Sequence, residues 1–118
     1  MLELVTDPNL QTDLRAGNWL PGSELTRLEN GLLQDGPVLT LLALQPGTIY
    51  RLMVGNANGG QAQVSVTLDN QVEVLPRYRL SKLGLNVFTF TCPQHGGQGV
   101  LELVPQDAVI NYVSVQPL

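Results

Sequence analysis

The sequence predicts an all-β fold, an antiparallel β-sandwich or jelly roll of about eight or nine strands. Short runs of apolar or alternating residues recur along the chain, and clusters of Gly, Pro, Asn and Asp separate them as turn formers do. Helical periodicity nowhere extends beyond about one turn. At 118 residues the chain fits a single domain, residues 1–118, that can bury a core without disulfides.

The clearest elements lie between residues 39 and 68. Two apolar runs, 39–44 and 48–54, flank the turn signal Gln45–Gly47. A Gly- and Asn-rich turn then leads into the alternating run 61–68. These runs predict three consecutive antiparallel strands, a meander in the middle of the sandwich.

The region before this centre contains weaker signals. Residues 2–5 are β-prone, and residues 24–33 predict a hairpin that turns at Asn30 and Gly31. Breakers on both sides of Trp19 predict an irregular crossing in which the indole ring plugs the core.

After the centre the signals are stronger. Pro76 is expected to end a strand at 71–75, and residues 77–85 are expected to form a connection over the surface. In the next strand, 86–91, the alternation places Phe88 and Phe90 toward the core. The last two predicted strands are 99–104 and 108–115.

Charge and hydropathy exclude two classes of partner. The net charge is −4 and only six residues are Lys or Arg, so the chain lacks the basic clusters that bind nucleic acid. No apolar run approaches the ~20 residues that a membrane-spanning helix requires, and residues 1–7 lack the basic and apolar segments of a secretion signal. Only 14% of the residues are charged, and such a surface suits burial against neighbouring subunits.

Catalytic constellations are missing from the sequence. Cys92 and His95 are the only residues of their types, and their positions at a strand end and in a Gly-rich turn favour a buried thiol and a solvated imidazole. One cysteine forms no internal disulfide and no thiolate metal site. The carboxylates lie in turns or on polar strand faces. No pair of them has the apolar setting that would raise the pKa of one carboxyl group and so make it a general acid beside an ionised partner. We therefore expect a protein that is not an enzyme.

The order of features resembles the jelly-roll sandwiches of the carbohydrate-binding-module type, also called galactose-binding-like. Such domains are attached to glycoside hydrolases and occur in phage structural proteins. The segments that carry the resemblance are Ala16–Trp19, Leu44–Leu52, Phe88–Pro93 and Ile110–Val115. Each is a folding signal, so the resemblance implies the fold more directly than the function.

The resemblance also implies a test for calcium. Members of this family often hold a structural Ca²⁺ between an early acidic loop and an acidic residue of the last strand. Here the last-strand position is Asn111, and the early loop offers only Asp7 and Asp13 with Gln11 between them. Because Ca²⁺ needs several anionic oxygens, we expect no metal and no other cofactor, with structural calcium as the alternative.

One loop is the best candidate for a specific contact. Tyr78 lies between Arg77 and Arg79, with Lys82 close by, and an exposed tyrosine flanked by polar groups can stack on a sugar ring. These four residues predict a glycan or partner loop. Tyr50 and Tyr112 are the other tyrosines that remain for such a role.

Two functions remain open. A short chain that begins with methionine and carries no signal or catalytic domain is expected as a phage virion component, a capsid decoration (cement) or tail protein located in the virion. Such a protein would pack on shell subunits, perform no catalysis and form a homo-oligomer. The expected assembly contacts are the terminal residues Met1, Leu2, Leu4, Gln116, Pro117 and Leu118. The alternative is a carbohydrate-binding module that recognises glycans.

Overall fold

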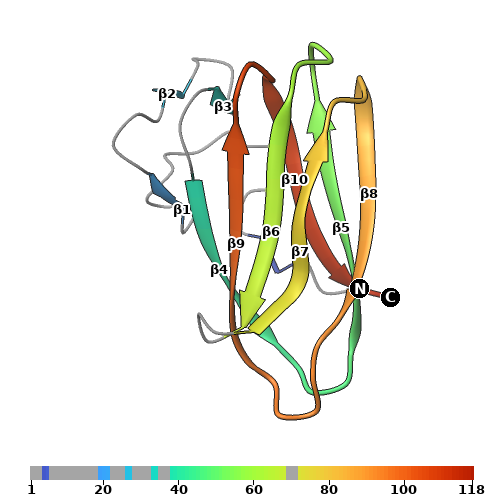
Figure 1. Ribbon diagram of the computed structural model, residues 1–118. Helices are drawn as coiled ribbons and strands as arrows, with labels where there is room; N and C mark the ends of the chain where they lie inside the picture. The colour runs from blue at the N-terminus through green and yellow to red at the C-terminus, as the bar shows by residue number, and fades with distance from the viewer. Residues whose placement is uncertain (1–3, 6–18, 22–25, 28–32, 35–37, 69–71) are drawn as a thin grey trace.

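The computed structural model describes residues 4–5, 19–21, 26–27, 33–34, 38–68 and 72–118 (Figure 1). This part of the chain contains ten strands. They are β1 (Trp19–Pro21), β2 (Thr26–Arg27), β3 (Leu33–Gln34), β4 (Val38–Leu44), β5 (Ile49–Asn56), β6 (Ala62–Leu68), β7 (Val72–Leu80), β8 (Gly84–Thr91), β9 (Gly97–Pro105) and β10 (Ile110–Pro117). The same part of the chain contains no helix of the length and hydrophobicity that crossing a membrane takes.

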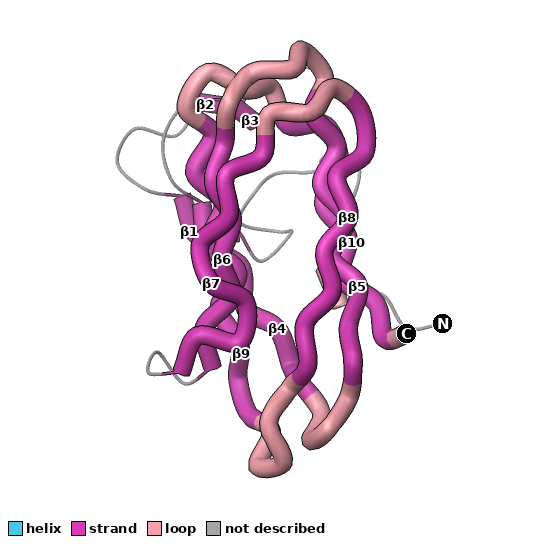
Figure 2. The backbone as a smooth tube through the Cα atoms, turned by 45° about the vertical axis from the view of Figure 1, so that its right-hand side comes forward, coloured by secondary structure: helices cyan, strands magenta, loops and turns pink. Residues whose placement is uncertain are grey.

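The strands form two antiparallel sheets that pack face to face (Figure 2). Sheet A has the order β1-β4-β9-β6-β7, and sheet B has the order β2-β3-β10-β5-β8. Seven long strands make the sandwich, four in sheet A and three in sheet B, while β1, β2 and β3 are two or three residues long. The expected all-β antiparallel sandwich is therefore confirmed.

Period-two alternation builds the core. In β6 the side chains of Val64, Val66 and Leu68 are buried, while the intervening Gln63, Ser65 and Thr67 remain partly accessible on the outer face. Sheet B supplies the opposing layer, which includes Leu52, Val54, Val113 and Val115. One apolar cluster thus spans both sheets.

The aromatic residues only partly follow the expectation. Phe90 is buried and stacks on Tyr50, whose ring centroid lies 5.5 Å away. Tyr50 is 1% exposed, so it is a core residue and was wrongly expected to remain accessible. Its hydroxyl accepts a hydrogen bond from the Gln45 N–H at 2.7 Å, which satisfies the one polar atom of the buried ring. Phe88 is half-buried against the edge of the core.

The predicted meander is wrong in its pairing, although its strands are present. β4 belongs to sheet A, β5 to sheet B and β6 again to sheet A, so the chain crosses the sandwich twice between residues 44 and 62. β4 pairs with β1 and β9, whereas β5 pairs with β10 and β8. Local alternation specifies which face of a strand is buried but not which strand becomes its neighbour.

Pro76 does not end a strand, and the expected loop at 77–85 is mostly β-structure. β7 continues to Leu80, and β8 begins at Gly84. The register with β6 shifts at this point: Val64 pairs with Tyr78 but Val66 pairs with Leu75, which leaves Pro76 and Arg77 opposite Ser65. Because β7 is an edge strand among the described strands and bulges here, a residue without an N–H is tolerated.

The termini and the first strands also differ from the expectation. Trp19 lies in β1, paired with Thr40, rather than in an irregular crossing. The predicted hairpin at 24–33 is present as the pairing of β2 with β3. Residues 4–5 are not a strand, but the Leu4 N–H donates to the Val115 carbonyl at 2.8 Å and Val5 is buried.

Candidate functional site

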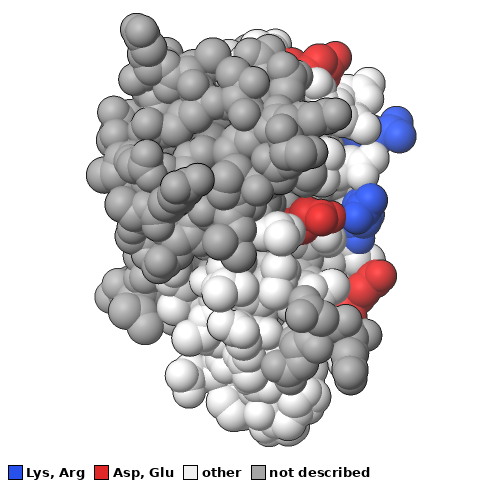
Figure 3. All heavy atoms as spheres, turned by 90° about the vertical axis from the view of Figure 1, so that its left-hand side faces the viewer, with Lys and Arg blue, Asp and Glu red and all other residues white. Residues whose placement is uncertain are grey.

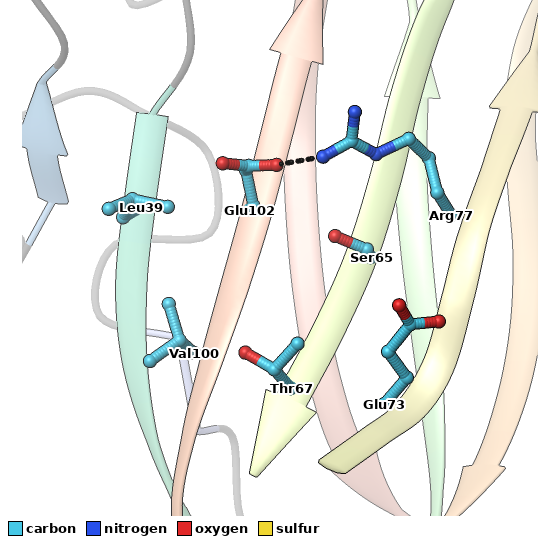
Figure 4. A pocket seen from close by; sticks show the side chains of 7 residues that line it. All are labelled: Leu39, Ser65, Thr67, Glu73, Arg77, Val100 and Glu102. Atoms are coloured by element: carbon cyan, nitrogen blue, oxygen red, sulfur yellow. Dashed lines mark hydrogen bonds and ion pairs between the residues drawn. The ribbon is translucent and has the colours of Figure 1, made fainter. Parts of the chain in front are cut away.

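The outer face of sheet A carries a hollow of about 270 Å³ that crosses β4, β9, β6 and β7 (Figure 4). Its lining contains two hydroxyls, two carboxylates, one guanidinium and two aliphatic side chains. They belong to Ser65, Thr67, Glu73, Glu102, Arg77, Leu39 and Val100.

Strand register brings these side chains together. Glu102 of β9 pairs with Leu39 of β4 on one side and with Ser65 of β6 on the other. One step along the sheet, Thr67 pairs with Val100 and with Glu73. Directly opposite residues of antiparallel strands share a face, so the two rows form one continuous surface.

An ion pair closes one side of the hollow. The Arg77 Nη2 atom lies 2.8 Å from the Glu102 Oε1 atom, and the two side chains are 60% and 32% exposed. The bulge at Pro76 aims Arg77 at the outer face, where it reaches over β6 to β9 (Figure 4). At this exposure the pair contributes at most about 1 kcal/mol to stability, so its main effect is to position two charged groups beside Ser65.

Charges of both signs gather on this side of the molecule. Figure 3 shows basic and acidic side chains close together along the side that sheet A forms. Hydroxyls, carboxylates and a guanidinium side by side can donate and accept hydrogen bonds in several directions. Such a lining suits a ligand that carries many hydroxyl groups, with Leu39 and Val100 available for its apolar faces.

The lining contains no aromatic residue, and its charged groups are the carboxylates of Glu73 and Glu102 and the guanidinium of Arg77. Across the described residues, no three His, Cys, Asp or Glu side chains gather as metal ligands would. Cys92 is 1% exposed and belongs to the core, as expected, and His95 is exposed in the turn before β9. Asn111, the last-strand position considered for calcium, is exposed in β10, while Asp7, Gln11 and Asp13 lie outside the described residues.

The residues predicted to form a glycan or partner loop lie mostly on a strand, and their role in binding stays a prediction. Arg77, Tyr78 and Arg79 belong to strand β7, and Lys82 lies in the turn that follows it. Tyr78 pairs with the buried Val64, so its ring points between the sheets and stacks on Phe88 with centroids 5.6 Å apart. The strand sends Arg77 to the hollow, whereas Arg79 and Lys82 line a second groove of about 480 Å³ along β7 and β8.

The expected assembly contacts are only partly visible. Met1 and Leu2 lie outside the described residues. Gln116 and Pro117 are not a free arm, because they form the end of β10 and pair with Arg51 and Tyr50 of β5. Leu118 is 69% exposed, although its N–H donates to the Ile49 carbonyl at 2.8 Å. Their role in assembly stays a prediction.

Sequence reasoning missed most residues of the hollow. Ser65 and Thr67 appeared only as polar positions of an alternating strand, and Glu73 and Glu102 appeared only among the carboxylates that were judged to form no catalytic pair. The signal that could have found them is the outer face of 61–68, where a Gln, a Ser and a Thr alternate with buried residues. Which strands lie beside that face, however, depends on pairings that the local pattern does not contain.

Among known proteins, similarity to this chain was found in solved structures and not in sequence families. No protein-family model matches the chain, and a search of curated proteins gave no match. Among solved structures, TmCBM61 in complex with β-1,4-galactotriose matches with a TM-score of 0.61 and 8% identity over 100% of both chains. A CBM4 structure matches with a TM-score of 0.58 and 14% identity over 97% of both chains.

A phage protein gives a match of the same quality. The enzymatically active domain of bacteriophage CBA120 tailspike protein 4 has a TM-score of 0.58 and 12% identity over 96% of this chain. This chain spans 21% of that structure, so the match covers a small part of a catalytic protein. The full-length matches are carbohydrate-binding modules. The resemblance inferred from the sequence is thus confirmed for the fold: the chain is a jelly-roll β-sandwich similar to those of solved carbohydrate-binding modules.

Proposed function

We propose that this domain is a non-catalytic carbohydrate-binding module whose saccharide occupies the hollow on sheet A. The observation that carries the proposal is the set of converging polar groups on one sheet face: Ser65, Thr67, Glu73 and the Arg77–Glu102 pair. The fold supports the same class, since its full-length structural matches are carbohydrate-binding modules.

The lining suggests the mode of binding. Without an aromatic ring in the hollow, recognition rests on hydrogen bonds from the hydroxyl and charged side chains to saccharide hydroxyls. These groups are already accessible to water, so each new hydrogen bond contributes only about 0.5–1.5 kcal/mol. We therefore expect modest affinity for a single chain of sugars.

The experiment is a calorimetric titration with β-1,4-galactotriose and a panel of other oligosaccharides. Thr67→Val removes one hydroxyl from the hollow while keeping the shape of the side chain, and we expect it to weaken binding about three- to tenfold. The matched control is Thr91→Val, the same change at an exposed position of β8 in the other sheet, which should bind as the parent does.

Two results would contradict the proposal. Absence of heat and of chemical-shift changes with every saccharide at millimolar concentration would exclude a glycan site of useful affinity. Equal losses in Thr67→Val and Thr91→Val would place the binding elsewhere.

A second candidate is a structural component of a phage virion, a capsid decoration or tail protein. The likeness to part of the tailspike structure favours it, because that protein contains a domain of this fold within a phage tail component. The two candidates are compatible, since a glycan-binding module can serve at a tail. Mass spectrometry of purified phage particles tests this candidate, and absence of the chain from them would exclude it.

A further inference from the structure

At one side of the sandwich, the edge strands β7 and β8 differ in how they are protected from pairing with another chain. β7 ends sheet A and β8 ends sheet B (Figure 2). β7 carries Pro76, a bulge, and the charged residues Glu73, Arg77 and Arg79. These are the features by which natural proteins prevent an edge strand from pairing with another chain.

β8 has none of these features. Its eight residues, Gly84–Thr91, include no proline and no charged residue. It pairs with β5 through eight consecutive positions without a register shift, so its other edge is straight and regular. Among the described strands nothing pairs with that edge.

Apolar side chains beside this edge are unusually exposed. Leu83, in the turn before β8, is 65% exposed, and Leu85 and Val87, in β8, are 47% and 54% exposed. Leu85 and Val87 lie on the outer face of β8 with Thr89 and Thr91. The ring of Tyr78, which lies over Phe88 at the same open side of the sandwich, is 47% exposed.

From these features we infer that β8 is the interface through which two copies of this chain associate, edge to edge and antiparallel across a twofold axis. An antiparallel strand is complementary to itself, because rotation about such an axis matches its N–H and C=O groups to those of the second copy. Residues directly opposite one another then share a face, so the outer residues Leu85 and Val87 meet outer residues of the other copy.

Charge favours a second copy over a charged partner. Each chain carries a net charge of −4, but β8 itself contains no charged residue, so the paired strands bring no like charges into the shared ladder, while Arg79 and Lys82 lie beside it in the groove along β7 and β8. The antiparallel arrangement also places the two Lys82 side chains, which lie in the turns before β8, at opposite ends of the shared ladder.

The size of the edge sets the expected strength. A strand of eight residues is about 27 Å long, and a contact about 15 Å across buries roughly 400 Å² on each copy. This is below the size of permanent dimers. We therefore expect a dimer that depends on concentration and dissociates on dilution.

The experiment is sedimentation velocity on the full chain, without saccharide, across a roughly hundredfold concentration range. The parent should shift from monomer to dimer. Val87→Lys places a charge on the exposed face of β8 and should raise the dimer dissociation constant at least tenfold. The matched control, Leu41→Lys, puts the same charge at a similarly exposed position of β4 in sheet A. It should change the dimer dissociation constant less than about twofold.

A mixing experiment tests the symmetry. Val87→Glu alone should also weaken the dimer, while an equimolar mixture of Val87→Lys and Val87→Glu should restore association, because the outer face that the two β8 strands share then carries opposite rather than like charges. Amide hydrogen exchange in residues 84–91 should slow as concentration rises. If Val87→Lys loses the far-ultraviolet spectrum of the parent, Thr89→Lys on the same face replaces it.

Three results would overturn the inference: a parent that stays monomeric throughout, equal weakening by Leu41→Lys, or exchange in residues 84–91 that is independent of concentration. The saccharide proposal is unaffected by each of them, because the hollow lies on the other sheet and its titration is a separate measurement.

Discussion

At the scale of single residues, hydrogen bonds and close backbone contacts join two loops at one end of the sandwich. These contacts leave no room for a larger side chain at Gly60. The loop after β5 and the loop after β9 meet here: the Gln61 carbonyl accepts from the N–H groups of Gln106, Asp107 and Ala108 at 2.9, 3.2 and 3.1 Å. The Gln61 N–H in turn donates to the Asp107 carboxylate. Gly60, the residue before Gln61, lies directly against the backbone of Asp107 and Ala108.

Gly60→Ala should therefore destabilise the fold. A Cβ atom on Gly60 would lie 2.4 Å from the Asp107 carbonyl oxygen and 2.7 Å from the Ala108 Cα atom, and backbone atoms cannot rotate away. We expect a loss of about 1–3 kcal/mol in the free energy of unfolding, measured by urea denaturation. The neighbouring change Gln61→Ala, at an exposed side chain, serves as the control and should stay within about 0.5 kcal/mol. Equal stability of Gly60→Ala and the parent would contradict the close approach.

At the scale of elements, the sequence specified the strands better than their partners. Alternation located β6 and β8, and the Pro46–Gly47 signal located the turn between β4 and β5, where Gly47 has a φ of 67°. The same signals implied neighbouring strands, whereas the chain crosses between sheets at this turn. The crossing depends on contacts distant in sequence, such as the Gly47 N–H that lies 3.1 Å from the Cys92 carbonyl.

In the candidate site, too, the sequence indicates the face on which a residue lies but not the residues that lie beside it. The positions of Ser65 and Thr67 on an outer face follow from alternation, but their approach to Glu73 and Glu102 follows from the pairing of β6 with β7 and β9. Arg77 was selected for its neighbours Tyr78 and Arg79 in the sequence. In the fold Arg77 and Tyr78 lie on opposite faces of β7, as consecutive strand residues do, and the partner of Arg77 is Glu102, which lies 25 residues away in the sequence.

The connection from β5 to β6 is held by one buried side chain, and its removal should weaken this element. Asn56 is 1% exposed; its amide nitrogen donates to the Gly60 carbonyl at 2.8 Å, and its amide oxygen accepts from the Asn58 and Gly59 N–H groups at 3.3 and 3.0 Å. Asn56→Ala leaves these groups without that partner and should cost about 1–3 kcal/mol in urea denaturation.

The comparison variant for this connection is Asn58→Ala. Asn58 also bonds to both loops but is exposed, so water can replace its contacts and the loss should stay below about 1 kcal/mol. A smaller loss in Asn56→Ala than in Asn58→Ala would show that burial does not decide the cost.

At the scale of the whole molecule, the core joins the two sheets into one unit. The buried cluster takes Val64, Val66 and Leu101 from sheet A and Leu52, Val113 from sheet B. Cys92 belongs to the same cluster at the end of β8, and it is the only cysteine of the chain. Its thiol therefore reports on how the core opens.

Labelling of Cys92 with a thiol reagent should follow global unfolding. Because the side chain is 1% exposed, the reagent reaches it only when the core opens, and with a typical stability of about 5–15 kcal/mol the native protein should react at least about a thousandfold more slowly than the unfolded chain. The urea midpoint from labelling should coincide with the midpoint from far-ultraviolet circular dichroism, as a single cooperative transition requires.

Thr91→Cys in a Cys92→Ala background provides the control, since residue 91 is exposed at the end of β8, directly before residue 92, and should react at the unfolded rate without urea. Labelling of Cys92 well below the spectroscopic midpoint would show instead that the end of the sandwich formed by the loops before β5 and after β8 opens on its own. In that case the hydrogen bonds between these loops, from Gly47 to Cys92 and from Cys92 to Thr48, would break before the sheets separate.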